Sequence, residues 1–219
     1  MRNLVIFGDT QYAERLYKYI MLEGVDRVVA FTQERNFMSR RNVQHIPVLN
    51  FEELKDIMNE EFEVILGIGY TKMNHFKAEI CEKCRGLNYS IGSYISKKSL
   101  IYSNDIGEGT FIAPGAIIGP GCKIGIGNYL ESAVVLSHDN IIGDYNFFST
   151  NSVLGGFAQV NNNCFFGLHS TIRDGISIND NNLIGSNANV LKSISSTGGV
   201  FVGNPAKPLF NKESLTTKI

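Results

Sequence analysis

Residues 106–124 read IGEGTFIAPGAIIGPGCKI, and within this stretch isoleucine recurs at every sixth position. The spacing continues without a slip to residue 190, which gives fifteen consecutive apolar hits. They are Ile106, Ile112, Ile118, Ile124, Leu130, Leu136, Ile142, Phe148, Leu154, Val160, Phe166, Ile172, Ile178, Ile184 and Val190. Chance does not produce such a run in a chain that is 43% hydrophobic, so this period decides the fold of the second half.

The residues around this ladder indicate short strands separated by sharp corners. Glycine often follows a ladder residue, at Gly107, Gly119, Gly125, Gly143, Gly155, Gly167 and Gly185, and small residues stand two positions before it, at Ala116, Cys122, Ser152, Ala158, Cys164, Ser170 and Ala188. Gly and Asn tolerate positive φ, so we expect them to form the corners. Successive triangular coils of three hexads would stack at about 4.8 Å with the ladder inside. Cys122 and Cys164 would then be core residues.

This hexad pattern resembles the left-handed parallel β-helix of hexapeptide-repeat acyltransferases. The match runs from about Tyr94 to Val190 with no inserted loop. The left hand is implied by the resemblance alone, because the general rule for parallel crossovers would predict the opposite hand.

The outward residues just before the ladder differ from face to face. Positions 18 apart give Phe111, Tyr129, Phe147, Phe165 and Leu183 on one face and Lys123, Ile141, Gln159 and Ser177 on another. An apolar stripe of this length exceeds what a monomer leaves exposed, so we expect another subunit to bury it. A homotrimer, as the resemblance implies, would do so; the alternative is that aromatic residues merely decorate the sheet.

Composition excludes several classes of function. The 20 basic and 21 acidic residues give a net charge of −1, which makes nucleic acid an unexpected partner. No signal peptide or stretch of about 18 apolar residues is present, so we expect a cytoplasmic protein with no membrane partner. Four cysteines in a reducing compartment indicate thiols, and Cys81-x-x-Cys84 lacks the second pair of a zinc site. No metal is expected.

The first ninety residues predict a separate α/β domain. NLVIFG, RVVAFT and FEVILGIG are typical of buried parallel strands, and helical patterns lie in TQYAERLYKYIMLEG, in NFEELKDIMNEE with Asn50 as its cap, and from Thr71 onward. The alternation resembles a small Rossmann-type sheet. The predicted domains are therefore 1–90, a Rossmann-like α/β domain, and 91–219, a β-helix with a C-terminal tail.

Ligands bind such sheets at the carboxyl ends of the strands. The dinucleotide motif GxGxxG is absent after the first strand, where Gly8-Asp9-Thr10-Gln11 stands, so full NAD binding is not expected. The helix starts after Gly8 and after Gly69-Tyr70-Thr71-Lys72 offer N–H groups to a phosphate, with Lys72 adding charge. The alternative is that both glycines are only tight turns.

His138 and Asp139 are the residues that predict chemistry. His138 lies two positions past Leu136, where side chains should point away from the core, and a neighbouring carboxylate would orient the ring and stabilise its protonated form. One coil further on stands Gly156, where a missing side chain would let a ligand approach the backbone. A solvated corner remains the structural alternative. A zinc hydratase would need three His ligands, and the repeat supplies two, His138 and His169.

The whole chain, closing with GVFVGNPAKPL at 199–209, resembles the family of sialic-acid O-acetyltransferases and nucleotide-amino-sugar N-acetyltransferases. The resemblance implies that His138 is the general base and that Asp139 raises its basicity. It implies acetyl-CoA in the groove between adjacent β-helices, with contacts at Phe147, Gly156, Gly167, Leu168, Gly185, Ser186, Gly203, Asn204, Pro205 and Ala206. It implies a nucleotide-linked sugar at Gly8, Thr10, Gln11, Thr32, Gln33, Gly69, Tyr70 and Lys72.

Two positions depart from the family pattern. Phe147 stands where some members carry a second histidine beside the thioester, and Thr32-Gln33 stand where some carry paired aspartates. The predicted activity is N-acetylation of a nucleotide-linked 4-amino-4,6-dideoxy sugar for surface glycan biosynthesis, without an acyl-enzyme. The alternatives are sugar O-acetylation and a non-catalytic scaffold or nucleotide-sugar-binding protein.

Overall fold

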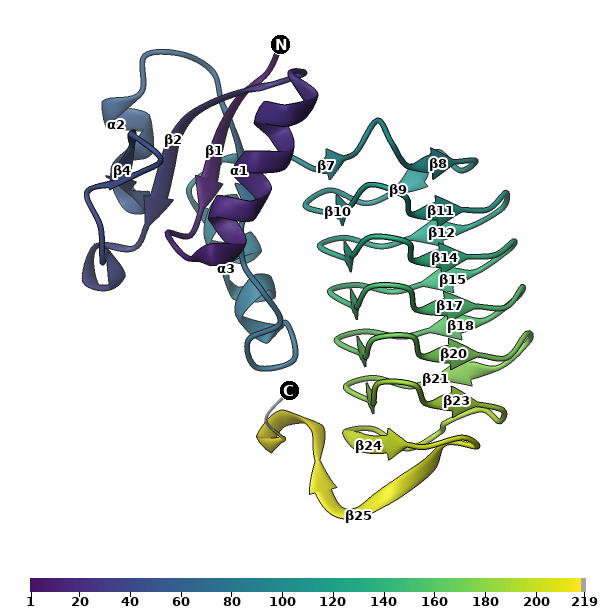
Figure 1. The fold of residues 1–219 in the computed structure, drawn as a ribbon. Coiled ribbons are helices and arrows are strands. Elements are labelled where there is room, and N and C mark those ends of the chain that lie inside the picture. Colours follow the sequence, from purple (N-terminus) through teal and green to yellow (C-terminus); the bar gives the residue numbers. More distant parts are fainter. Residues whose placement is uncertain (218–219) are drawn as a thin grey trace. The chain divides into compact units, whose positions relative to one another are not determined.

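The computed structural model describes residues 1–217, which divide into two compact units (Figure 1). The first unit comprises residues 1–69 and 79–94, and the second comprises residues 70–78 and the chain from residue 95 onward. The short segment 70–78, which the sequence suggested was part of the first domain, therefore groups with the second unit. No helix in the described part of the chain is long and apolar enough to cross a membrane.

The first unit is a six-stranded sheet with helices, in the order β3-β4-β2-β1-β5-β6. Its elements are β1 (Asn3–Phe7), α1 (Gln11–Glu23), β2 (Arg27–Gln33), η1 (Arg35–Phe37), β3 (Asn42–Val43), β4 (Ile46–Asn50), η2 (Phe51–Glu53), α2 (Leu54–Ile57), β5 (Glu63–Leu66), α3 (His75–Gly86) and β6 (Ser90–Ile91). The first four residues of α3 group with the second unit. All pairings are parallel except that of β3 with β4. The three predicted strands are confirmed, with β1 between β2 and β5.

Helix α1 follows the predicted pattern, because Ala13, Leu16 and Ile20 are buried and Gly24 ends it in the left-handed region with φ 62°. The helix predicted from Asn50 is present but shorter than expected, over residues 51–57. Asn50 ends β4, and only a 3₁₀ turn and the four-residue α2 follow, since burial of Phe51 and Leu54 satisfies the apolar pattern within two turns. The helix expected from Thr71 begins at His75, because residues 72–74 form a left-handed turn.

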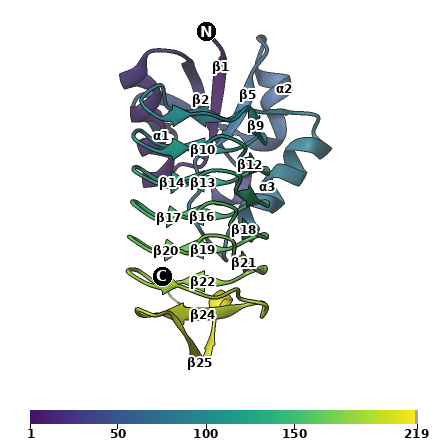
Figure 2. The same ribbon diagram turned by 90° about the vertical axis from the view of Figure 1, so that its right-hand side faces the viewer.

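The second unit is a left-handed parallel β-helix, as expected (Figure 2). Its strands are β7 (Tyr94–Ile95), β8 (Leu100–Ile101), β9 (Asp105–Ile106), β10 (Phe111–Ile112), β11 (Ile117–Ile118), β12 (Lys123–Ile124), β13 (Tyr129–Leu130), β14 (Val135–Leu136), β15 (Ile141–Ile142), β16 (Phe147–Phe148), β17 (Val153–Leu154), β18 (Gln159–Val160), β19 (Phe165–Phe166), β20 (Thr171–Ile172), β21 (Ser177–Ile178), β22 (Leu183–Ile184) and β23 (Asn189–Val190). Strands 18 residues apart pair in register, as Tyr129 does with Phe147.

These strands form three sheets, which we name by the register of their strands. The aromatic sheet contains β7, β10, β13, β16, β19 and β22; the aliphatic sheet contains β8, β11, β14, β17, β20 and β23; and the polar sheet contains β9, β12, β15, β18 and β21. At the C-terminal end β24 (Gly199–Val202) continues the aromatic sheet, and β25 (Lys207–Glu213) returns antiparallel to it before η3 (Ser214–Thr216). Each coil therefore contributes one strand to each sheet and has three corners. We call the line of stacked corners between two sheets an edge of the β-helix.

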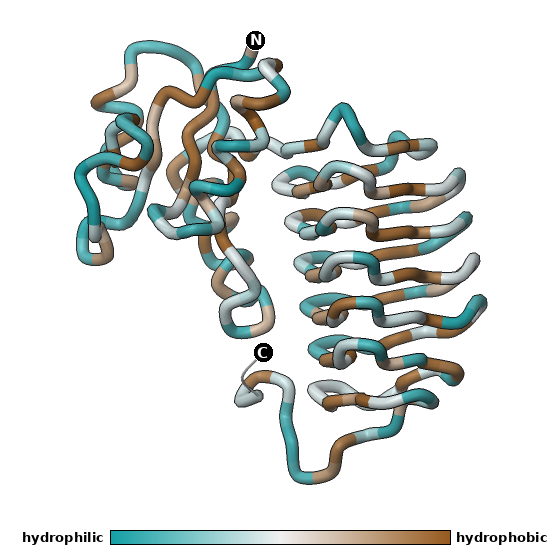
Figure 3. The backbone as a smooth tube through the Cα atoms, in the orientation of Figure 1, coloured by the Kyte–Doolittle hydropathy of each residue, from teal (hydrophilic) through white to brown (hydrophobic). Residues whose placement is uncertain are grey.

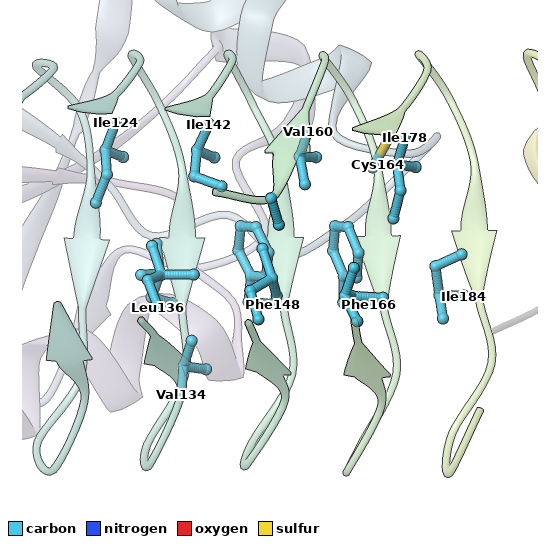
Figure 4. Packing of buried hydrophobic residues seen from close by; sticks show 14 of the residues in the cluster. Ile124, Val134, Leu136, Ile142, Phe148, Val160, Cys164, Phe166, Ile178 and Ile184 are labelled. Carbon is cyan, nitrogen blue, oxygen red and sulfur yellow. The ribbon is translucent and has the colours of Figure 1, made fainter. Parts of the chain in front are cut away.

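The aliphatic ladder fills the interior of the coils, as predicted. From Ile112 to Val190 every ladder residue is at most 3% exposed, and the small residues two positions earlier, among them Cys122 and Cys164, lie in the same core (Figure 4). Apolar residues recur in every coil of the stack (Figure 3). The six-residue period in the sequence therefore marks the side chains that point into the interior of the β-helix.

The glycines after the ladder have a different role from the one expected. Positive φ occurs two residues later, for example at Gly121, Asp139 and Phe157, and not at Gly119. A Cβ on Gly119 would lie 1.7 Å from the carbonyl oxygen of Ser137 in the next coil. These glycines therefore permit close approach of successive coils, while the corner conformation falls to another register.

The aromatic face is covered by the protein's own chain, which corrects the expectation of a second subunit there. Phe111, Tyr129, Phe147 and Phe165 form a stack with centroid distances of 4.1, 5.0 and 5.4 Å. The Tyr70 ring meets Phe147 and Phe165 edge to face, at 5.0 Å from each. The amine of Lys77, which is 1% exposed, lies 4.9 Å above the Tyr129 ring.

Partly exposed apolar residues line the outward face of the aliphatic sheet. Its outward positions include Ile117, Val135 and Val153, each partly exposed, in register with one another. The polar face behaves as expected, since Lys123, Ile141, Gln159 and Ser177 are exposed.

Candidate active site

His138 and Asp139 occupy the edge between the aliphatic and polar sheets, in the corner that joins β14 to β15. The side chains point outward and are each 50% exposed, which agrees with the predicted orientation. Nδ1 of His138 lies 2.9 Å from Oδ2 of Asp139. Asp139 has φ 55°, a conformation that Asp tolerates better than most residues, and its N–H donates to the carbonyl of Pro120 in the preceding coil.

The His138 ring lies directly over Gly156 of the next coil. A Cβ on Gly156 would be 2.5 Å from Nε2 and 2.6 Å from Cε1 of the ring. The space above Gly156, expected to admit a ligand, is therefore filled by the imidazole itself. If Nδ1 donates its hydrogen to the carboxylate, Nε2 is the unprotonated nitrogen and can accept a proton. The His138 ring thus packs directly on the Gly156 backbone, which a side chain at that position would prevent.

Phe157 is a neighbour that the sequence analysis did not identify. Its ring centroid lies 5.0 Å from that of His138, with an interplanar angle of 89°. The signal available in the sequence was its register, 18 residues after Asp139 and 36 after Gly121, where a bulky residue is unexpected.

Most of the residues assigned to acetyl-CoA lie on a different edge, between the aromatic and aliphatic sheets. Gly167 and Leu168 follow β19, Gly185 and Ser186 follow β22, and the loop 203–206 follows β24. Leu168 is 50% exposed, and the N–H of Ala206 donates to the carbonyl of Asn189 at 2.8 Å. These residues stack on one another in successive coils and form one continuous edge.

This edge and the His138 edge lie on opposite sides of the aliphatic sheet. Within one coil six residues separate equivalent corner positions such as Ser132 and His138, so the edges lie up to roughly 20 Å apart at about 3.3 Å per residue. Within one chain, the predicted catalytic pair and most of the predicted acetyl-CoA residues therefore lie on two different edges.

Phe147, also assigned to acetyl-CoA, lies on neither of these edges. It is 3% exposed, stacked between Tyr129 and Phe165 on the aromatic sheet and covered by Tyr70. Its side chain is engaged in packing on this sheet. Tyr70, which was assigned to the nucleotide-sugar, packs its ring on this sheet through the same contacts.

Several residues assigned to the nucleotide-sugar converge at the carboxyl ends of β1, β2 and β5. The N–H of Gly8 donates to the carbonyl of Thr32 at 2.8 Å, and a Cβ on Gly8 would lie 3.0 Å from the carbonyl oxygen of Gly67. Gly69 lies so close to Tyr12 that a Cβ there would be 2.6 Å from its ring. Thr10 and Gln11 are exposed at the start of α1. At this edge of the sheet, backbone segments approach one another closely at Gly8 and Gly69, and the polar side chains of Thr10 and Gln11 are accessible.

Thr32 and Gln33 are less available than expected. Thr32 is fully buried, and its hydroxyl donates to the carbonyl of Leu49 at 2.9 Å. Gln33 is 9% exposed, and its Oε1 accepts from the N–H of Glu34. The Thr32 side chain therefore lies in the interior of the sheet. Lys72 is exposed, with φ 50°.

A buried carboxylate at this edge was missed. Asp9 is 4% exposed, and its Oδ2 accepts from the N–H and the hydroxyl of Ser39 at 3.0 and 2.6 Å. The contact ties the loop after β2 to the loop after β1. No sequence signal indicated it, because the two residues are 30 positions apart.

The four cysteines are free thiols and all are buried, as predicted for Cys122 and Cys164. Burial raises the pKa of Cys164 to about 12 and also raises the pKa of the Cys122 thiol. Among residues 1–217 no group of three or more His, Cys, Asp or Glu side chains could hold a metal ion.

A hollow of about 730 Å³ lies at the other edge of the first unit's sheet, away from the predicted ligand edge. Its lining includes Arg2, Lys55, Glu60, Glu63 and Tyr89. Arg2 there pairs with Glu63 at 2.9 Å, so its lining charges are partly neutralised. None of the predicted site residues lines it.

The fold and the site geometry define a class: an α/β unit followed by a left-handed β-helix with a His-Asp pair at one edge. No model of a known protein family and no curated protein matches the sequence.

Solved structures do match over nearly the whole chain. The acetyltransferase domain of PglB from Neisseria gonorrhoeae FA1090 is 20% identical, with a TM-score of 0.83, over 95% of this chain and 100% of that one. PerB from Caulobacter crescentus, solved with CoA and GDP-perosamine, is 20% identical, with a TM-score of 0.82, over 95% and 98%. WeeI from Acinetobacter baumannii AYE is 19% identical, with a TM-score of 0.84, over 95% and 100%. These similarities establish the shared fold.

Proposed function

We propose that this protein is an acetyl-CoA-dependent N-acetyltransferase that acts on a nucleotide-linked 4-amino-4,6-dideoxy sugar, with His138 as general base. The observation that carries the proposal is the outward His138 ring, whose Nδ1 lies 2.9 Å from Asp139. A regular stack of coils needs no ionisable pair at its edge. GDP-perosamine and CoA bound to PerB, a protein of the same fold, support this substrate class.

The chemistry follows from the needs of an amine nucleophile. A sugar amine must first lose one proton to solvent, after which its nitrogen lone pair attacks the thioester carbonyl carbon. His138 Nε2 then accepts the second proton as the C–N bond forms, and Asp139 stabilises the resulting imidazolium. A backbone N–H would stabilise the oxyanion. When the C–S bond breaks, the imidazolium returns the proton to the thiolate, which leaves the amide, free coenzyme A and neutral His138.

The division of the predicted site between two edges supports a second copy as part of the site. Leu168 and Ser186 lie on one edge and His138 on another, with the partly exposed aliphatic sheet between them. If the aliphatic sheet of one copy packed beside its neighbour, the first edge of one chain would meet the second edge of the next. Repeated around a closed ring, this heterologous contact gives the homotrimer. The site would then be incomplete in a monomer.

The first unit would hold the nucleotide-sugar. Gly8, Thr10, Gln11 and Gly69 offer backbone and polar groups at the carboxyl ends of the strands, where α/β sheets bind ligands. The protein would act in the cytoplasm, where acetyl-CoA and nucleotide-sugars are available, and would supply surface glycan assembly.

An assay of thiol release tests the proposal. The purified full chain is incubated with acetyl-CoA and with matched nucleotide-sugars that carry either an amine or a hydroxyl at carbon 4. Thiol release that needs the amine, with the acetylated sugar found by mass spectrometry, is the expected result. Release with the hydroxyl sugar alone would indicate O-acetylation. Release with neither, together with no thermal shift by acetyl-CoA, would indicate a scaffold.

A further inference from the structure

The residue beneath the His-Asp pair adopts a conformation that its type disfavours. Phe157 has φ 59° in the corner between β17 and β18, and its N–H donates to the carbonyl of His138 at 3.0 Å. The same register holds Gly121, Asp139 and Gly175 in the neighbouring coils, residues that tolerate this conformation. A bulky residue with positive φ lowers the free energy of unfolding, so the backbone of this corner does not explain why phenylalanine is present.

Burial does not explain the choice either. Phe157 is 59% exposed, and the contact described for its ring is with His138. Tyr145 offers a comparison, since it has φ 56° in another corner but is only 9% exposed, with its ring against Gly127. The Tyr145 ring is packed into the coil stack, whereas the Phe157 ring stands at the surface beside the imidazole.

Three neighbouring residues contact the His138 ring from different sides. Asp139 accepts from Nδ1, Gly156 leaves room for the ring below, and Phe157 meets it at 89° with 5.0 Å between centroids. The hydrogen bond to the carboxylate restricts the ring at its Nδ1 end. A perpendicular aromatic neighbour restricts the tilt of the ring as well, because edge-to-face contact has a defined geometry.

We propose that Phe157 is a positioning residue for the reaction: it holds the His138 imidazole over Gly156 so that Nδ1 stays on Asp139 and Nε2 stays directed at the nucleophile. This inference rests on the proposed function. Phe157 touches the base and not the reacting atoms, so its effect should fall on turnover. Small displacements of a catalytic group lower the rate strongly because bound reactants need a near-attack geometry.

The test is Phe157→Asn, which relieves the backbone while it removes the ring. Asparagine already fills the positive-φ position of other corners, for example Asn163 and Asn181. We expect Tm to stay unchanged or rise by about 2 °C. We expect kcat to fall about tenfold with KM for both substrates nearly unchanged. Opposite effects on stability and turnover exclude a merely structural role for the ring.

Companion variants sharpen the result. Phe157→Tyr keeps the ring and should retain most of kcat. Gln44→Asn relieves positive φ in the β3–β4 hairpin and should leave kcat unchanged. In a double-mutant cycle, Phe157→Asn should cause no further loss in a His138→Ala background, because its effect passes through the imidazole. A rise in KM for acetyl-CoA with normal kcat, or an additive loss in the cycle, would overturn the proposal.

A readout that does not need activity separates this inference from the proposed function. The ¹⁵N resonances of the His138 ring report which nitrogen carries the hydrogen. The wild-type protein should show the Nδ1-protonated form, and Phe157→Asn should show a mixture of tautomers. Identical spectra would refute the positioning role even if the enzyme is active. A wild-type protein with the ordered tautomer but no transfer would refute only the function.

Discussion

The ring of Tyr70 lies 5.0 Å from that of Phe147 and the same distance from that of Phe165, edge to face in both cases. Tyr70 precedes a left-handed turn in which Lys72, Met73 and Asn74 have φ between 50° and 64°. Three such residues in succession are disfavoured, so tertiary contacts must hold the turn. The contact with the aromatic sheet is one of them, and Nδ2 of Asn163 donates to the carbonyl of Met73 at 3.3 Å.

Tyr70→Ala should destabilise the protein by about 2 kcal/mol, since a partly buried aromatic ring and two ring contacts are lost. Chemical denaturation measures the change, and Tyr70→Phe serves as the control that keeps the ring. If Tyr70 instead bound substrate, as the sequence suggested, the alanine variant would raise KM with no loss of stability.

Two glycines should respond to the same substitution in different ways. Gly119→Ala places a Cβ 1.7 Å from a backbone oxygen, so the coils must separate and soluble yield or Tm should fall sharply. Gly156→Ala meets the end of the His138 ring at 2.5 Å, and a side chain can rotate away. That variant should fold normally and lose activity. Equal losses of stability in both would contradict this distinction.

Asp139→Asn should lower kcat by about 10²-fold, because the carboxylate orients the His138 ring through Nδ1 and stabilises the imidazolium that forms as the amine attacks. Steady-state kinetics at a single pH measure the loss, and KM for both substrates should stay nearly unchanged. A variant with the wild-type kcat would show that Asp139 does not act on the base.

The thiols should be inert in the folded protein. Burial raises the pKa of Cys122 and raises the pKa of Cys164 to about 12, so neither forms appreciable thiolate near pH 8. A colourimetric thiol reagent should therefore react slowly with native protein and rapidly with all four cysteines in denaturant. Rapid labelling of the native protein would contradict the burial of these groups.

The β-helix could be predicted because one physical constraint repeats in every hexad: the ladder residue must fill the interior, as Leu136 and Ile142 do. The outward orientation of His138 follows from the same register. The role of Gly119 could not be assigned in this way, since positive φ and close approach both favour glycine and only the distance to Ser137 distinguishes them.

The features that sequence analysis missed depend on contacts between distant residues. Tyr70 meets Phe147 across 77 positions of sequence, and no local pattern announces that the aromatic stripe is covered internally. The Asn50 helix was over-extended because the apolar pattern of 51–54 also suits a strand end followed by a short turn. Phe157 differs, because its register alone marked it as unusual for a positive-φ corner.

The central claim is that His138 accepts the proton of the attacking amine. The most direct measurement is single-turnover acetyl transfer by His138→Ala, at saturating acetyl-CoA and amino sugar, with the oligomeric state checked by light scattering. The account predicts a loss of about 10²- to 10⁴-fold in the chemical step with the assembly and substrate affinities intact. A variant that transfers the acetyl group at nearly the wild-type rate would contradict it.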